Sequence, residues 1–116
     1  FGVEALMAAY NDGEEWLEEL KQYLFANYNY LRVYFEEYLP EFPVATLEGT
    51  YLVWADCSVL NQSSDETVKT LLEKEKLWVN EGSLYGEAGE GFIRINIACP
   101  RQQLIEGLNR LRRALK

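Results

Sequence analysis

The sequence predicts an α+β domain in which helices cover a small, mainly antiparallel sheet and one helix near the N-terminus is long. Apolar residues recur every three or four positions over long stretches, which is typical of amphipathic helices, while two shorter runs rich in β-branched and aromatic residues resemble strands. The order is helix, strand, helix, short strand, glycine-rich loop, strand, helix. At 116 residues and 48% hydrophobic content, the chain has the size and apolar content of a single domain, residues 1–116.

Composition and charge exclude several classes of function. The formal net charge is -8, and this acidity argues against binding to nucleic acid or to an anionic membrane surface. No apolar run has the length of a membrane span, and no signal peptide is recognisable, so a cytoplasmic location is expected. Cys57 and Cys99 lie in apolar runs, where we expect free, core-forming thiols. Two cysteines without histidine do not make a zinc site, so no metal is expected.

The first ten residues, FGVEALMAAY, read as the end of a helix, because Val3, Leu6, Met7 and Tyr10 have helical spacing. No residue precedes Phe1 to start that helix. We therefore expect a piece of a longer protein, with residues 1–10 as the tail of a preceding domain or an interdomain helix.

A long helix is predicted next, with Asn11 or Asp12 as its N-cap and its end at Leu39, because Pro40 cannot continue it. Its apolar side chains recur at three- and four-residue steps, as expected for a face buried in the core. The density of tyrosines also suggests a stacking site for a cofactor, but a core face is the favoured interpretation. The predicted face consists of Trp16, Leu20, Tyr23, Leu24, Leu31, Tyr34, Phe35 and Tyr38.

The middle of the chain alternates a strand with a second helix. Residues from about Gly49 to Ser58 are rich in β-branched and aromatic types and predict a strand. Ser63 and Glu66 then form a capping-box pattern at the start of a helix of roughly a dozen residues. Its apolar face consists of Val68, Leu71 and Leu72.

Four of the eight glycines follow within residues 82–91, between a short apolar run at Leu77–Val79, read as a short strand, and a longer strand. The loop lacks the spacing and the lysine of phosphate-binding loops. In the longer strand, alternation directs three isoleucines to the core and Phe92, Arg94, Asn96 and Ala98 to the other face. Pro100 then starts a helix with a buried stripe. The core residues of these two elements are Ile93, Ile95, Ile97, Leu104, Leu108 and Leu111.

Arg94 is the candidate functional residue, because a fixed positive charge stands inside an apolar strand. On the pattern alone, the favoured interpretation is a structural ion pair with a neighbour such as Asp56 or a glutamate.

Four stretches change this interpretation, because together they resemble the C-terminal small domain of the class I/II aminotransferase family, fold type I of the pyridoxal-phosphate enzymes. Within the family, AAYNDGEEWL and NIACPR resemble the MalY/PatB branch of cystathionine β-lyase-type C–S lyases. The likeness covers essentially the whole chain. The four stretches are ALMAAYNDGEEWLEELKQYL, GTYLVWADC, WVNEGSLYGEAGEGFIRINIACPR and LIEGLNRL.

The resemblance implies that Arg94 binds the α-carboxylate of an amino-acid substrate, a task that suits the parallel N–H donors of a guanidinium. It implies weaker roles near the substrate entrance for Asn80, Gly82, Tyr85 and Gly86, where phenylalanine is more usual than Tyr85. We also expect Asn96 to support Arg94 by hydrogen bonding. Arg101 is expected to be a surface side chain, with a role in neutralising substrate charge as the alternative.

The resemblance also implies that the catalytic lysine and the cofactor site lie outside this chain. The family's catalytic lysine and its pyridoxal 5'-phosphate site belong to a large domain with no match here, so no residue of this chain is expected to be catalytic or to bind the cofactor. A C–S lyase acting on a sulfur-containing amino acid, as a homodimer when full length, is the first hypothesis. A class I/II aminotransferase comes second, and a non-catalytic binding or regulatory module third.

Overall fold

A computed structural model describes residues 1–116 and confirms the predicted α+β class. The four α-helices are α1 (Gly2–Asp12), α2 (Glu14–Tyr38), α3 (Ser64–Glu75) and α4 (Arg101–Leu115). The three strands are β1 (Leu52–Asp56), β2 (Asn80–Glu81) and β3 (Phe92–Asn96), and they form one antiparallel sheet in the order β1-β3-β2. Short 3-10 turns occupy residues 58–60, 82–85 and 87–89.

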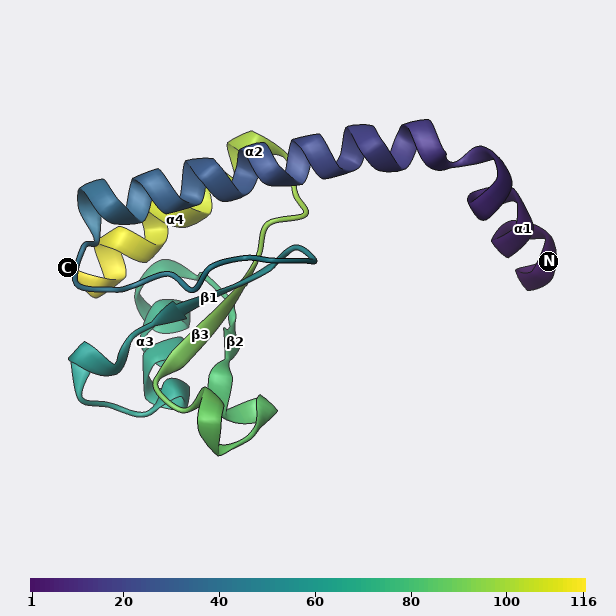
Figure 1. Cartoon of the computed structure of the whole chain (residues 1–116). Coiled ribbons are helices and arrows are strands. Elements are labelled where there is room, and N and C mark those ends of the chain that lie inside the picture. The colour runs from purple at the N-terminus through teal and green to yellow at the C-terminus, as the bar shows by residue number, and fades with distance from the viewer.

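The helices are not arranged evenly around the sheet. In Figure 1, α2 runs along one side of the molecule, α4 lies beneath its C-terminal half, and α1 stands away from the rest at the N-terminal end. No residue of α1 is buried. None of the four helices combines the length and the apolar character that a membrane crossing needs.

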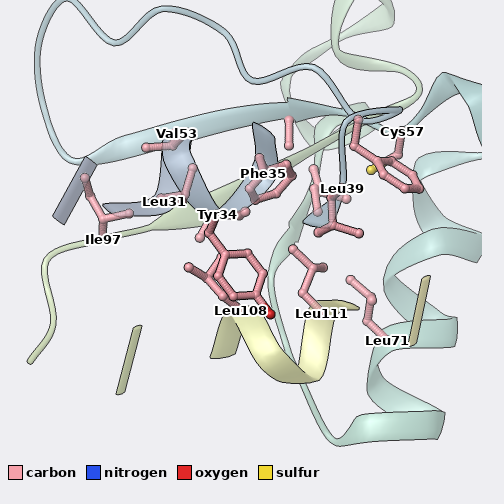
Figure 2. Packing of buried hydrophobic residues seen from close by; sticks show 14 of the residues in the cluster. Leu31, Tyr34, Phe35, Leu39, Val53, Cys57, Leu71, Ile97, Leu108 and Leu111 are labelled. Atoms are coloured by element: carbon pink, nitrogen blue, oxygen red, sulfur yellow. The ribbon is translucent and has the colours of Figure 1, made fainter. Parts of the chain in front are cut away.

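The core lies where the C-terminal half of α2, the sheet, α3 and α4 meet (Figure 2). Leu31, Phe35 and Leu39 enter it from α2 and its end, and all are at most 2% exposed. The predicted core residues of β3 and α4 are confirmed, since each is at most 8% exposed. They are Ile93, Ile95, Ile97, Leu104, Leu108 and Leu111.

The long helix begins later than predicted. Asn11 and Asp12 belong to α1, and Gly13 separates α1 from α2. A Cβ atom at Gly13 would collide with the carbonyl oxygen of Ala9, so the close approach of the chain at this break requires glycine. The predicted buried face holds only for the C-terminal half of α2, beneath which α4 lies (Figure 1). Trp16 is 66% and Tyr23 43% exposed, and Tyr23 reaches the start of α4 only with its hydroxyl, which accepts from the backbone N–H of Arg101 at 2.8 Å.

The remaining elements follow the sequence with local differences. The capping box of α3 is confirmed, with Ser63 accepting from the backbone N–H of Glu66 and the Glu66 carboxylate accepting from that of Ser63. Leu72 is 44% exposed, so its prediction as a core residue was wrong. The predicted strand 49–58 shortens to β1, and β2 lies just after the predicted run Leu77–Val79, at the point where the chain pairs with β3.

Cys57 and Cys99 are both free, and their environments predict different reactivity. Burial raises the pKa of the Cys57 thiol from 9.0 to about 12, and the charge of Asp56 adds to the shift. Burial also raises the pKa of Cys99, which is only half-buried. Iodoacetamide labelling of the folded protein should therefore modify Cys99 at least about tenfold faster than Cys57, because the thiolate is the nucleophile.

The same pKa shift predicts a pH dependence of stability. Between pH 9 and about pH 12 the unfolded chain loses the Cys57 proton while the folded chain keeps it. This thiol's contribution to the free energy of unfolding is therefore complete below that window and falls as the pH rises through it.

The control for the iodoacetamide prediction is labelling in urea, which should remove the difference in modification rate between Cys57 and Cys99. Equal modification rates of the two cysteines in the folded protein would contradict that prediction.

Candidate functional site

A row of three side chains crosses the sheet on the face opposite the core. Trp54 of β1 pairs with Arg94 of β3, which pairs on its other side with Asn80 of β2. Directly paired residues of antiparallel strands point to the same face, so the three side chains lie next to one another. All three are half-buried. The middle strand therefore holds the guanidinium between an indole and a carboxamide.

Arg94 has no carboxylate partner. It takes part in none of the salt bridges of the chain, and the Asp56 carboxylate instead accepts from the backbone N–H of Ser58 at 2.8 Å. One Nη of Arg94 approaches Oδ1 of Asn80 at 3.5 Å, the outer limit of a hydrogen bond. The Nε atom is buried without a hydrogen-bond partner in the chain. The structural ion pair favoured by the strand pattern is thus absent.

The guanidinium instead lies over an aromatic ring. The Cζ atom of Arg94 is 4.3 Å from the ring centroid of Tyr85, within the range of a cation–π interaction. Tyr85 in turn meets Trp54 edge to face, with ring centroids 5.4 Å apart and an interplanar angle of 81°. Trp54 also lies 6.4 Å from the Phe92 ring. Trp54, Tyr85 and Phe92 therefore form an aromatic cluster, and Arg94 stacks on its Tyr85 ring.

The glycine-rich loop brings Tyr85 to this position. Gly82 and Gly89 approach so closely that a Cβ atom on either would collide with the carbonyl oxygen of the other, and Gly86 has a φ of 106°, which favours glycine. The loop is fixed to the start of α3, where Ser64 donates its backbone N–H to Glu90 at 2.7 Å and its hydroxyl accepts from the N–H of Gly91 at 2.8 Å. These contacts fix the backbone of the loop that carries Tyr85.

A groove of about 540 Å³ borders the row between the chain at residues 77–80, β3 and α4. Asn80, Arg94 and Asn96 line one part of it. Asn96 does not bond to Arg94, because its Oδ1 accepts from the backbone N–H of Ala98 at 2.8 Å. Asn80 is the amide that approaches Arg94. The other part of the groove is lined mainly by α4, including the ion-paired Glu106 and Arg110.

Comparison with known proteins shows what the chain as a whole is similar to. The chain is 36% identical to cystathionine beta-lyase PatB of Bacillus subtilis over 99% of its own length, and 38% identical to Protein MalY of Escherichia coli over 98%. The crystal structure of cystalysin from Treponema denticola, which contains a pyridoxal 5'-phosphate cofactor, superposes over 98% of the chain with a TM-score of 0.92 and 32% identity. The chain is a homologue of the aminotransferase-like C–S lyases.

The homology covers one part of these enzymes. The chain spans 30% of the length of PatB, 29% of MalY and 29% of the cystalysin chain. Its fold is that of an aminotransferase C-terminal domain, and pyridoxal phosphate is the cofactor of this fold type I family. Aminotransferases are relatives as well, since the aspartate aminotransferase of Pyrococcus horikoshii is 33% identical over 99% of this chain and 29% of that protein. No family model matches the chain.

In this C–S lyase homologue, Arg101 is held by a cluster that the sequence did not reveal. Its Nε donates to Oδ1 of Asn27 at 2.7 Å, and its guanidinium lies 5.2 Å from the ring centroid of Tyr30. Asn27 is fully buried, and its Nδ2 donates to the carbonyl oxygens of Ile97 and Cys99 at 2.8 and 3.0 Å. Arg101 is thus a fixed, half-buried side chain that joins α4 to α2.

The five lysines of the chain lie away from Arg94 in sequence and structure. Three of them form ion pairs with Glu18, Glu73 and Glu41, and the others donate to the carbonyl oxygens of Ala114 and Glu73. None lines the groove beside Arg94. They are Lys21, Lys69, Lys74, Lys76 and Lys116.

Proposed function

We propose that this chain is the C-terminal small domain of a pyridoxal-phosphate-dependent C–S β-lyase of the cystathionine β-lyase type, and that Arg94 binds the substrate's α-carboxylate. The observation that carries the proposal is the half-buried guanidinium of Arg94, which has no carboxylate partner in a chain with 19 acidic residues. A cation left without an anion on a ligand-sized groove is suited to bind an anionic ligand.

The role of Arg94 is to fix the orientation of the substrate. Two parallel N–H groups of a guanidinium hold both oxygens of a carboxylate, so they set the direction of the bonds at the neighbouring Cα. Pyridoxal phosphate, when bound, supplies the electron-withdrawing capacity that makes Cα acidic and allows loss of a thiolate from Cβ. Arg94 selects the reacting bond without exchanging a proton, because its guanidinium stays charged.

The residues of this chain fit the substrate carboxylate rather than the cofactor. The ammonium groups of the five lysines are engaged on the helices or at the C-terminus, so we expect the catalytic lysine and the cofactor site in a preceding large domain. The isolated chain is then inactive. The exposed apolar side chains of α1 and the start of α2 would pack against that domain in a cytoplasmic homodimer. They are Phe1, Val3, Leu6, Met7, Tyr10 and Trp16.

A product assay on the full-length polypeptide with pyridoxal phosphate tests the proposed reaction. The lyase converts L-cystathionine and water into homocysteine, pyruvate and ammonia, so pyruvate and a free thiol should appear without any added keto acid. An aminotransferase, the second candidate because of the relatives with that name, would need a keto acid acceptor and would keep the sulfur skeleton intact. Absence of both reactions would overturn the proposal in favour of a binding or regulatory module.

A further inference from the structure

Three arginines of the chain, Arg94, Arg101 and Arg112, take part in no salt bridge, and each lies over a tyrosine ring. Arg101 also donates to Asn27. Arg94 differs from both, because it stands in the central strand and its Nε atom is buried without a partner. Apart from one Nη that approaches Asn80 at 3.5 Å, its support is the Tyr85 ring, whose centroid lies 4.3 Å from Cζ.

We propose that Tyr85 is a positioning residue: its ring holds the guanidinium of Arg94 in the orientation that receives the substrate carboxylate. This inference rests on the proposed function of Arg94. The resemblance gave Tyr85 only a weaker role near the substrate entrance, and this inference assigns the ring a specific one.

The chemistry of a guanidinium explains why a ring serves this purpose better than a carboxylate. A carboxylate partner would bind the N–H groups in the plane of the guanidinium and neutralise its charge. An aromatic ring attracts the guanidinium through its face and occupies none of its N–H donors. Stacking on Tyr85 therefore limits the rotation of the side chain without neutralising its charge or using any of its N–H donors.

The ring is itself held in place from two directions. Trp54, which is paired with Arg94 across the strands, meets Tyr85 edge to face. The loop on either side of Tyr85 is fixed by the close approach of Gly82 and Gly89. The Tyr85 hydroxyl has no hydrogen-bond partner in the chain, and the residue is 47% exposed. The ring rather than the hydroxyl therefore carries the role, and substitution at this exposed position should leave the fold intact.

The test compares how the full-length holoenzyme and its variants bind two probes, L-methionine and L-methioninamide, measured by isothermal titration calorimetry. The amide lacks the carboxylate, so the ratio of the two dissociation constants reports on recognition of that group alone. Tyr85→Leu should lower the preference for L-methionine about fivefold to tenfold, and Tyr85→Met should do the same, because both remove the cation–π contact. Tyr85→Phe should retain the wild-type preference.

Tyr51→Leu is the matched control, because Tyr51 is 43% exposed and contacts no arginine guanidinium. Its preference should equal that of wild type. The inference is overturned if Tyr85→Leu keeps the wild-type ratio of dissociation constants. It is also overturned if Tyr85→Phe or the Tyr51→Leu control loses as much of the preference for L-methionine as Tyr85→Leu does. Arg94→Ala separates the two proposals: if it keeps the preference for L-methionine, or if wild type has none, the carboxylate role of Arg94 itself has failed.

Discussion

Replacing Arg94 by alanine in the full-length polypeptide is expected to lower kcat/KM for L-cystathionine by roughly a hundredfold to a thousandfold. No carboxylate of the chain pairs with the half-buried guanidinium, so its charge is available to the substrate. Its removal therefore leaves the substrate carboxylate without a charged partner. The substrate also loses the contact that orients its Cα bonds, so kcat should fall as well as KM rise. Pyruvate release measured over a range of substrate concentrations separates the two effects.

Two further variants sharpen this prediction. Arg94→Lys keeps the charge but not the two parallel donors, so its loss should lie between that of wild type and Arg94→Ala. Arg32→Ala removes an arginine that forms an i,i+4 pair with Glu36 on the surface of α2, where the side chain is 46% exposed. Its activity should be unchanged. An Arg94→Ala enzyme as active as wild type would show that Arg94 has only a structural role in the strand.

The sequence was sufficient to predict the elements of the fold, because each has a periodic pattern of its own. Ile93, Ile95 and Ile97 alternate in β3, and the leucines of α4 recur along one helix face, so burial follows from local spacing. The same reasoning failed at Trp16 and Tyr23. Helical periodicity identifies an apolar face but not the length over which a neighbour covers it, and only the C-terminal half of α2 has the sheet and α4 beside it.

The site was predictable only at its centre. Arg94 is conspicuous as a charge inside an apolar strand, but its support comes from Tyr85, which is nine residues away in sequence, and from Trp54 on another strand. Asn96 had seemed the natural support because it shares the strand face of Arg94, yet its amide bonds to the backbone of Ala98. Contacts of this kind depend on strand register and loop geometry, which a single sequence does not determine.

Asn27 gave no signal in the sequence, because a single polar residue inside an apolar helix stripe resembles an interruption of the pattern. In the structure it is fully buried on α2 and binds the segment that connects β3 to α4. That segment begins directly after the strand that carries Arg94. The position of Arg94 relative to α2 therefore depends on a buried amide as well as on the apolar core.

Replacing Asn27 by alanine is expected to lower the stability of this part of the protein by about 2–4 kcal/mol. The substitution removes the amide donors to the carbonyl oxygens of Ile97 and Cys99 and the acceptor for Arg101. At least the Ile97 contact lies in the buried interior, where an unsatisfied carbonyl costs more than a typical hydrogen bond contributes. Native-state hydrogen exchange of the β3 and α4 amides in the full-length protein measures the loss locally.

Asn29→Ala is the matched control, since Asn29 lies in the same helix, is half-buried and forms no hydrogen bond through its side chain. Both variants replace asparagine by a better helix former, so any gain in helix propensity is common to them. The difference between the two therefore isolates the buried amide contacts. If Asn27→Ala exchanges its β3 and α4 amides no faster than Asn29→Ala, the connection is held by the apolar core alone. If it exchanges faster, Asn27 is the polar link that fixes the end of the Arg94 strand against the long helix.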